Sequence, residues 1–269
     1  MAWYWFCLHR NEPKIGNPYG FCSASRTFPK TRSKSPSFVA EPSSIPYSGD
    51  FPMCPLCLST DTKPICHDTT RFESARVYVR CLPCDLIFVP PDQHLTPQEE
   101  KLRYDQHEND PSDPRYRTFL RKLADPVLNA IPPDSCGLDF GCGPGSAMPR
   151  LFGHYGHRIR LYDPLYFPDQ TAFQETYDFI VCSETAEHLS DPRREFLRCW
   201  GILKEGGVFG LMTLRHDSSI DFDHWHYRMD DTHVCFYSDR TIHTIARLLK
   251  ATVQIVSNRV VLFHKVSPI

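Results

Sequence analysis

A short strand followed at once by a glycine-rich turn constrains the fold of this chain more than any other stretch. Residues 136–151 read CGLDFGCGPGSAMPRL, where an apolar strand from Gly137 to Phe140 delivers Asp139 into a turn before a helix. The turn holds three glycines, namely Gly141, Gly143 and Gly145. Glycines let backbone N–H groups approach a ligand outside the carboxyl end of the strand, since no side chain intervenes. The stretch therefore predicts an α/β fold in which a doubly wound sheet binds a ligand at this turn.

An acidic residue at the end of the following strand indicates the kind of ligand. The strand predicted from His157 to Tyr162 ends in Asp163, eighteen residues after Gly145. A carboxylate there is placed to accept hydrogen bonds from both hydroxyls of a ribose, so a nucleoside cofactor is expected. A dinucleotide site needs GxGxxG, whereas this turn has GxGxG with a proline inside it. The spacing disfavours an NAD-dependent oxidoreductase, which stays a lesser alternative.

The acid and the three glycines form a D-x-G-x-G-x-G pattern that resembles motif I of class I S-adenosylmethionine-dependent methyltransferases. Tyr177–Leu189, YDFIVCSETAEHL, resembles the fourth strand of that family. Leu197–Thr213 resembles its next helix, turn and fifth strand, although Glu205 stands where many members carry proline. Arg259–Lys265 suits the last, antiparallel strand. The resemblance implies a Rossmann-like methyltransferase sheet, S-adenosyl-L-methionine (SAM) as cofactor, and an enzyme of class EC 2.1.1.

The resemblance also implies roles for residues around the cofactor. Asp163 would bind the ribose or, alternatively, only cap the end of its strand, and Asp139 would contact the cofactor's amino group indirectly or orient the glycine turn. Only the twelve residues Leu165–Thr176 connect the second strand to the fourth. A parallel crossover alone takes about a dozen residues, so the third strand is expected to be missing or vestigial. Adenine-binding residues usually follow that strand, and their expected substitutes are Phe167, Ser183 and Glu184.

Four cysteines predict a metal site ahead of this domain. Cys54-Pro-Leu-Cys57 and Cys81-Leu-Pro-Cys84 are two CxxC knuckles separated by twenty-three residues, close to the spacing of a four-thiolate zinc ribbon. Four thiolates close the coordination of Zn²⁺, so the ion would be structural. The alternatives are free cysteines in two turns or a redox CxxC, and Cys66-His67 is an alternative ligand pair. The arrangement resembles the zinc-ribbon-bearing methyltransferases often found in bacteria.

The end of the fourth strand, Ser183–His188, is where acceptor-binding residues of such enzymes gather. His188 is the expected base, since the unperturbed pKa of histidine, about 6.5, suits neutral pH. Its alternative is a histidine that packs at a helix start for structure alone. No NPPY-like or DPPY-like tetrapeptide occurs there, which counts against methylation of exocyclic amines on bases. The missing tetrapeptide and the formal net charge of −2 together argue against a nucleic-acid substrate.

A second polar stretch, HWHYRMDDTHVCFY at residues 224–237, follows the predicted fifth strand and resembles a WHYxxDxTHVxFY segment that recurs there in the family. One interpretation is an acceptor pocket, with His226 and His233 as basic groups and Trp225, Tyr227 and Tyr237 stacking on the substrate. A second is structural, in which an aspartate caps a turn and the histidines tie the loop to the sheet. A third is a metal site drawn from His224, His226, His233 and an aspartate, although the spacing matches no strong ligand signature.

The remaining segments complete four expected parts: a tail at 1–51, the ribbon at 52–91, a helical linker or lid at 92–133, and the methyltransferase domain at 134–269. Residues 1–49 hold eight Ser, six Pro and six Lys or Arg against two acids, which predicts disorder or an organelle transit peptide. Thr96 is the expected N-cap of a helix in the linker, and Ser238 is the expected N-cap of the helix after the second polar stretch. In the linker, Tyr104, His107 and Tyr116 either reach a ligand or form ordinary helix surface. No apolar run spans a bilayer, so a cytoplasmic protein is expected, or a plastid or mitochondrial one if the tail is cleaved.

The expected function is SAM-dependent methyl transfer to a small-molecule acceptor, with carbon or oxygen favoured over nitrogen, and with neither a membrane nor a nucleic acid as partner. The alternative class is a binding module in which the ribbon recognises a partner and the methyltransferase fold has lost turnover.

Overall fold

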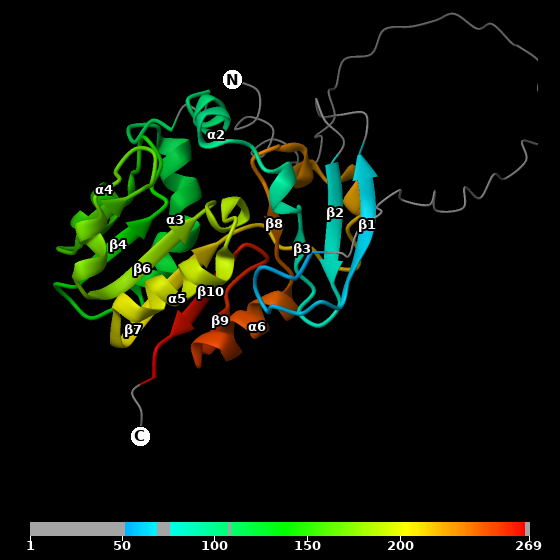
Figure 1. The fold of residues 1–269 in the computed structure, drawn as a ribbon. Helices are drawn as coiled ribbons and strands as arrows, with labels where there is room; N and C mark the ends of the chain where they lie inside the picture. The colour runs from blue at the N-terminus through cyan, green and yellow to red at the C-terminus, as the bar shows by residue number, and fades with distance from the viewer. Residues whose placement is uncertain (1–51, 69–75, 107–108, 267–269) are drawn as a thin grey trace, which may run out of the picture. The chain divides into compact units, whose positions relative to one another are not determined.

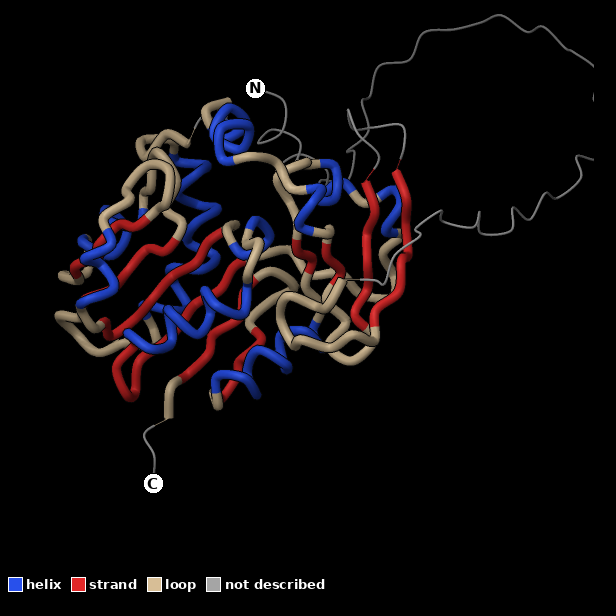
Figure 2. The backbone as a smooth tube through the Cα atoms, viewed as in Figure 1, coloured by secondary structure: helices blue, strands red, loops and turns tan. Residues whose placement is uncertain are grey.

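The computed structural model describes residues 52–68, 76–106 and 109–266, so the hypotheses on the tail at 1–51 and on His107 lie outside the described residues. The larger of its two sheets has six strands in the order β5-β4-β6-β7-β10-β9 (Figures 1 and 2). The strands are β4 (Cys136–Phe140), β5 (Arg158–Tyr162), β6 (Tyr177–Ser183), β7 (Leu203–Met212), β9 (Thr252–Ile255) and β10 (Val260–His264).

The pairing of these strands confirms the predicted α/β sheet. The strands β5, β4, β6 and β7 run parallel, and β10 is antiparallel to both β7 and β9. The carboxyl ends of β4, β5 and β6 therefore meet at one edge, where a doubly wound sheet binds its ligand.

The missing third strand is also confirmed. In the described part of the chain β5 is the edge strand of the sheet, and the link from β5 to β6 contains only the short 3-10 helix η2 (Gln170–Gln174). A link of this length cannot hold a strand and a crossover helix, because a parallel connection takes a dozen or more residues by itself.

Helices cover both faces of the sheet. The side chains of neighbouring residues in β7 point to opposite faces. A Cβ on Gly210 would lie 2.6 Å from Val127 of α3 (Pro114–Leu128), whereas the ring of Phe209 packs 6.0 Å from Phe196 of α5 (Pro192–Ile202). The remaining helices are α2 (Pro97–Tyr104), α4 (Met148–Gly153) and α6 (Asp239–Leu249).

The predicted helix starts are found where local side chains satisfy free backbone N–H groups. Thr96 caps α2 in a capping box with Glu99, and Ser238 caps α6 in a capping box with Thr241. Each cap supplies acceptors that the first turn of a helix otherwise lacks, so these boundaries could be predicted from local sequence.

The second sheet has four strands in the order β1-β2-β3-β8, all antiparallel. The first three, β1 (Thr62–Asp68), β2 (Arg76–Cys81) and β3 (Ile87–Phe88), come from the cysteine-rich segment, and β8 (Cys235–Phe236) comes from the second polar stretch. Short 3-10 helices complete the chain: η1 (Pro91–Gln93), η3 (Ala186–His188), η4 (Phe222–His224) and η5 (His226–Met229). A strand more than 140 residues downstream thus completes the sheet of the cysteine-rich segment.

Two arginines fasten the loop that leads to β8 against this second sheet. Arg76 at the start of β2 donates hydrogen bonds of 2.7 Å to the backbone carbonyls of Asp231 and His233. Arg228, on the loop, pairs with Asp68 at 3.1 Å, and both of these side chains are almost completely buried. The loop is therefore held by charged groups of the second sheet as well as by strand pairing.

Within the described residues, no helix combines the length and the apolar character that crossing a membrane requires.

The close packing around β4 gives the first prediction. A Cβ on Gly137 would lie 2.2 Å from the ring of Phe179, which is itself stacked on Phe152 of α4 at 4.6 Å. Overpacking of this kind costs about 1–3 kcal/mol, so Gly137→Ala should lower the free energy of unfolding by that amount in denaturant titrations.

The matched control is Gly201→Ala in α5, where a Cβ meets no other atom within 4 Å. Because alanine favours a helix over glycine by up to about 1 kcal/mol, this variant should be as stable as the wild type or more stable. Equal stability of the two variants would contradict the described packing of β4.

Candidate functional site

The glycine turn after β4 adopts a conformation that only glycine tolerates well. Gly141 and Gly143 have φ angles of +73° and +63°. A Cβ on Gly141 would lie 2.1 Å from the side chain of Thr185, and one on Gly145 would lie 2.2 Å from the backbone oxygen of Asn109. The first and third glycines are thus required by their neighbours, and the turn presents its backbone at the carboxyl edge of the sheet.

Asp163 lies directly after β5 and its carboxylate faces this turn. One oxygen accepts a hydrogen bond of 3.0 Å from the N–H of Gly143, and the other accepts from the N–H groups of Leu165 and Tyr166 at 2.8 and 3.1 Å. Both oxygens are therefore fixed beside the turn, and the strand-capping contacts considered for this residue are present.

Asp139 is buried beneath the turn rather than exposed to a ligand. Its carboxylate accepts a hydrogen bond of 2.5 Å from Ser146 Oγ, which in turn accepts from the N–H of Met148 at the start of α4. Burial raises the pKa of Asp139 to about 7, and the nearby charge of Asp163 adds to the rise. These contacts are those of a residue that orients the turn and the following helix.

The end of β6 is joined to the glycine turn by a hydrogen bond. Thr185, which follows Ser183 and Glu184 in the chain, donates a hydrogen bond of 3.0 Å from Oγ1 to the carbonyl of Gly141. Glu184 has a φ of +48°, a region that residues other than glycine rarely adopt and that recurs at functional sites. Its carboxylate accepts from Arg259 Nη1 at 3.2 Å. The residues that follow β6 are therefore contiguous with the turn.

A second carboxylate, Glu187, is fully buried beside Glu184. Glu187 Oε1 accepts a hydrogen bond from the Tyr227 hydroxyl, whereas its other oxygen, Oε2, has no hydrogen-bond partner. Burial raises the pKa of both carboxyls, and the charge of Glu187 raises that of Glu184 further. Sequence reasoning assigned no role to Glu187, although its place beside His188 in the EHL ending was a signal.

The structure brings two of the predicted histidines together. The rings of His188 and His233 lie 4.7 Å apart, and the ring of Tyr104 packs against His188 at 5.3 Å. The Nδ1 atoms of the two histidines lie 3.1 and 2.6 Å from backbone carbonyls, those of Thr232 and Tyr227 respectively. Burial lowers the pKa of both imidazoles, so both are neutral at pH 7.

Of the other residues proposed for the second polar stretch, Tyr227 is buried beside His233, with ring centroids 4.4 Å apart. His226 is half-buried in η5, with its ring 6.5 Å from that of Tyr227. His224 is exposed and pairs with Asp221 at 2.8 Å, and neither of these two histidines belongs to a group of described residues close enough to share a metal ion. Tyr237 was expected to stack on a substrate, but it is fully buried and donates to the carbonyl of Ala186, so it is a core residue.

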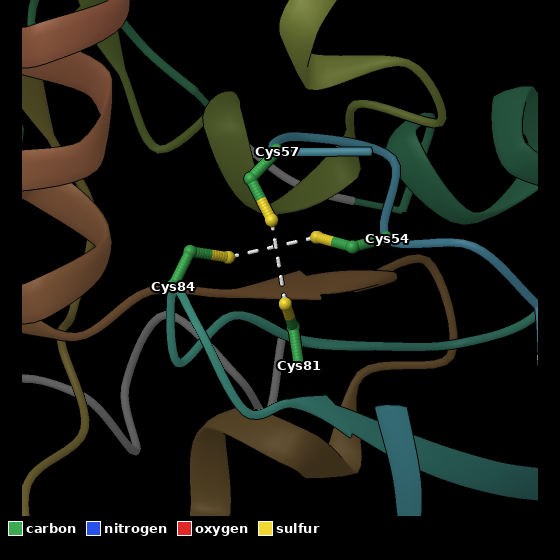
Figure 3. A group of neighbouring side chains, drawn as sticks. All are labelled: Cys54, Cys57, Cys81 and Cys84. Carbon is green, nitrogen blue, oxygen red and sulfur yellow. Dashed lines mark hydrogen bonds between the residues drawn. The ribbon is translucent and has the colours of Figure 1, made fainter. Parts of the chain in front are cut away.

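The four cysteines of the two knuckles converge on one point (Figure 3). Their sulfur atoms all lie within 4.8 Å of one another, with Cys54 and Cys84 at 3.5 Å and Cys57 and Cys81 at 3.4 Å. None of them forms a disulfide. The cluster is compatible with a zinc ribbon.

The two knuckles are built alike. The N–H of Leu58 donates to the carbonyl of Cys54 at 3.0 Å, and that of Asp85 donates to the carbonyl of Cys81 at 2.9 Å. Both Leu58 and Asp85 have positive φ angles, of 63° and 67°, so each turn places its two sulfurs on one side. Cys66 lies apart from the cluster, with its sulfur 3.5 Å from Arg228 Nη1, so the Cys66-His67 pair is not the metal set.

Comparison with solved structures finds similar chains. The chain is similar to the YcgJ protein from Bacillus subtilis, with 19% identity over 51% of this chain and 70% of that chain and a TM-score of 0.40. It is similar to an O-methyltransferase family protein from Burkholderia thailandensis, with 12% identity over 62% and 63% of the two chains and a TM-score of 0.44. It is also similar to human N-acetylserotonin methyltransferase in complex with SAM, with 13% identity over 57% of this chain and 54% of that chain and a TM-score of 0.44.

A search of curated proteins finds no match to the sequence. A family model described as a methyltransferase domain matches residues 112–252, just over half of the chain. This match covers the glycine turn, Asp163, the end of β6 and the loop that carries His233. The chain therefore belongs to the methyltransferase domain family.

Proposed function

We propose that the protein transfers a methyl group from SAM to a small-molecule acceptor, at a carbon or oxygen atom. The observation that carries the proposal is the contact between two halves of one site. The glycine turn, which would hold the cofactor, accepts a hydrogen bond from Thr185. Thr185 in turn belongs to the segment that bears Glu187 and His188. Cofactor and acceptor would thus meet at the carboxyl ends of β4, β5 and β6.

On the cofactor side, the residues that would hold SAM share the carboxyl edge of the sheet: Asp139, Gly141, Gly143, Gly145, Asp163, Ser183 and Glu184. Bound SAM supplies a methyl group already activated on a sulfonium. Asp163 would exchange part of its contacts with backbone N–H groups for the ribose hydroxyls, which its two oxygens can accept together. Asp139 would support cofactor binding indirectly, because it orients the glycine turn.

On the acceptor side, we place the substrate against His188, His226 and His233. Alignment of the acceptor and exclusion of water account for most of the rate in such a transfer. The imidazoles of His188 and His233, which are neutral at pH 7, would accept a hydrogen bond or a proton from the acceptor. A carbon or oxygen acceptor would lose its proton to this set. An amine would also lose one, so the preference over nitrogen rests on the lack of an NPPY-like tetrapeptide after β6, which counts against base amines.

For the ribbon, we propose that Cys54, Cys57, Cys81 and Cys84 bind a structural Zn²⁺. A tetrahedron with Zn–S bonds of about 2.3 Å has sulfur–sulfur edges of about 3.8 Å. The observed separations of 3.4 and 3.5 Å, with all pairs within 4.8 Å, fit such an ion. Because all four positions would be thiolates, the ion would take no part in the chemistry.

Loss of the Asp163 carboxylate should abolish tight cofactor binding. Hydrogen bonds to a charged group contribute about 1.5–3 kcal/mol each, so Asp163→Ala should weaken SAM binding by tenfold or more in isothermal titration calorimetry. Asp163→Asn keeps one acceptor oxygen of the two that the backbone N–H groups use, so it should weaken SAM binding less than Asp163→Ala does. Asp125→Ala, which removes an exposed carboxylate of α3, is the control. Full affinity in Asp163→Ala would remove the assignment.

Asp139 should make stability depend on pH. An unfolded aspartate titrates near its ordinary pKa of about 3.9, whereas burial raises the pKa of Asp139 to about 7 in the folded protein. Between these values the folded state binds more protons, so this group lowers stability as pH rises through that window. Asp139→Asn, whose amide oxygen can still accept from Ser146, should therefore raise the melting temperature more at pH 8 than at pH 5.

Other titrating groups are common to Asp139→Asn and the wild type, so their contributions cancel in the difference of melting temperatures. An equal difference at pH 5 and pH 8 would show that Asp139 is ionised throughout and that its burial does not control its charge.

Removal of one knuckle sulfur should release zinc. Cys54→Ser should lose one equivalent of zinc by mass spectrometry and should melt at a lower temperature, since the ribbon sheet includes β8. Cys136→Ser, at the start of β4 and outside the cluster, should keep the zinc content of the wild type. Unchanged zinc in Cys54→Ser would exclude the ribbon as the zinc site.

A further inference from the structure

Three side chains of the proposed acceptor site form a second set of metal donors. Glu187, His188 and His233 each offer a ligand atom, and these atoms lie within 4.8 Å of one another. Glu187 and His188 belong to η3 at the end of β6, whereas His233 lies on the loop before β8. Strand pairing and the contacts of Arg76 with that loop bring the three together.

Both histidines are oriented as metal ligands usually are. The carbonyls of Thr232 and Tyr227 can only accept hydrogen bonds, so the Nδ1 atoms that face them, in His188 and His233, carry the proton. Each Nε2 atom then keeps a lone pair for another partner. A metal-bound histidine typically donates its second ring N–H to a carbonyl or carboxylate in this way, which fixes the tautomer and the ring.

Glu187 supplies an oxygen that the protein leaves without a partner. Its Oε1 accepts from the Tyr227 hydroxyl, but Oε2 is buried with no hydrogen-bond partner, and the whole residue is inaccessible to solvent. Leaving a carboxylate oxygen buried and unpaired is unfavourable. Arg259 faces Glu184, the other carboxylate here, at 3.2 Å. A cation bound at Oε2 would satisfy the remaining oxygen.

We propose that Glu187, His188 and His233 bind one divalent transition-metal ion through Oε2 and the two Nε2 atoms. Two imidazoles and one carboxylate are a donor set of catalytic zinc and non-haem iron sites, which keep positions open for substrate. Tetrahedral donor atoms about 2.1 Å from one ion are about 3.4 Å apart, so the observed separations of up to 4.8 Å would close by up to about 1.4 Å on binding. Asp230 Oδ2 lies 3.9 Å from His233 Nε2, but Asp230 does not belong to this group of donors.

This inference rests on the proposed function and defines the acceptor further, as an oxygen acceptor bound to the ion. A bound ion lowers the pKa of a hydroxyl that coordinates it. The acceptor O–H bond then breaks with loss of the proton to water, the oxygen forms a bond to the methyl carbon, and the S–CH3 bond breaks to leave a neutral thioether. His188 and His233 thus act on the acceptor through the ion, and no oxidant or reductant is needed.

Cobalt is a suitable probe because it reports its ligands by absorption. With the ribbon already loaded with zinc, added Co²⁺ should give one equivalent of visible d–d absorption, without the charge-transfer band of thiolate ligands. Glu187→Gln and His233→Ala should each weaken this binding at least tenfold. His224→Ala, which removes an exposed histidine of the same loop, should bind cobalt as the wild type does.

X-ray absorption at the cobalt edge of the wild type tests the same site without any variant. Nitrogen and oxygen scatterers support the proposal, and sulfur scatterers or no saturable binding overturn it. Wild-type affinity for cobalt in folded Glu187→Gln and His233→Ala also overturns it. Calorimetric binding of SAM in the absence of cobalt is measured in parallel, so failure of the metal site with SAM binding intact leaves the methyltransferase proposal standing.

Discussion

A buried arginine of the ribbon holds the loop of the proposed acceptor site, and the arrangement of that site depends on it. Arg76 donates from its two terminal nitrogens to the carbonyls of Asp231 and His233, each at 2.7 Å. Hydrogen bonds from a charged donor contribute about 1.5–3 kcal/mol each, and here they fix the backbone on both sides of Thr232. The carbonyl of Thr232 and the ring of His233 both face His188.

The cysteine-rich segment is therefore a structural part of the proposed site. From a second direction Arg228 pairs with Asp68 of β1 and lies over the ring of Tyr78 at 5.0 Å. The carbonyl of Cys84 accepts from the hydroxyl of Thr241 on α6, which ties one cysteine knuckle to the methyltransferase domain. The parallel strands thus position the proposed cofactor side, and the second sheet positions the proposed acceptor side. A structural zinc would act on the reaction only through this packing.

Much of the fold could be predicted because its signals are local. A few neighbouring residues are enough to predict the glycine turn, the acid after β5, the two CxxC knuckles and the caps Thr96 and Ser238. The short link between β5 and β6 by itself excluded the third strand. The pairing of β8 with β3, and the meeting of Glu187 with His233, depend on segments that are far apart in sequence. Tyr237 was assigned to the pocket because aromatic residues serve both cores and binding sites, and only its burial decides between them.

The central claim is that cofactor and acceptor meet between the glycine turn and the cluster of Glu187, His188 and His233. A crystal structure of the protein with SAM bound tests it most directly. We expect the ribose hydroxyls at Asp163, the cofactor backbone along Gly141 and Gly143, and the sulfonium methyl directed at His188 and His233. SAM bound away from the glycine turn, or a methyl group directed away from these two histidines, would contradict the account.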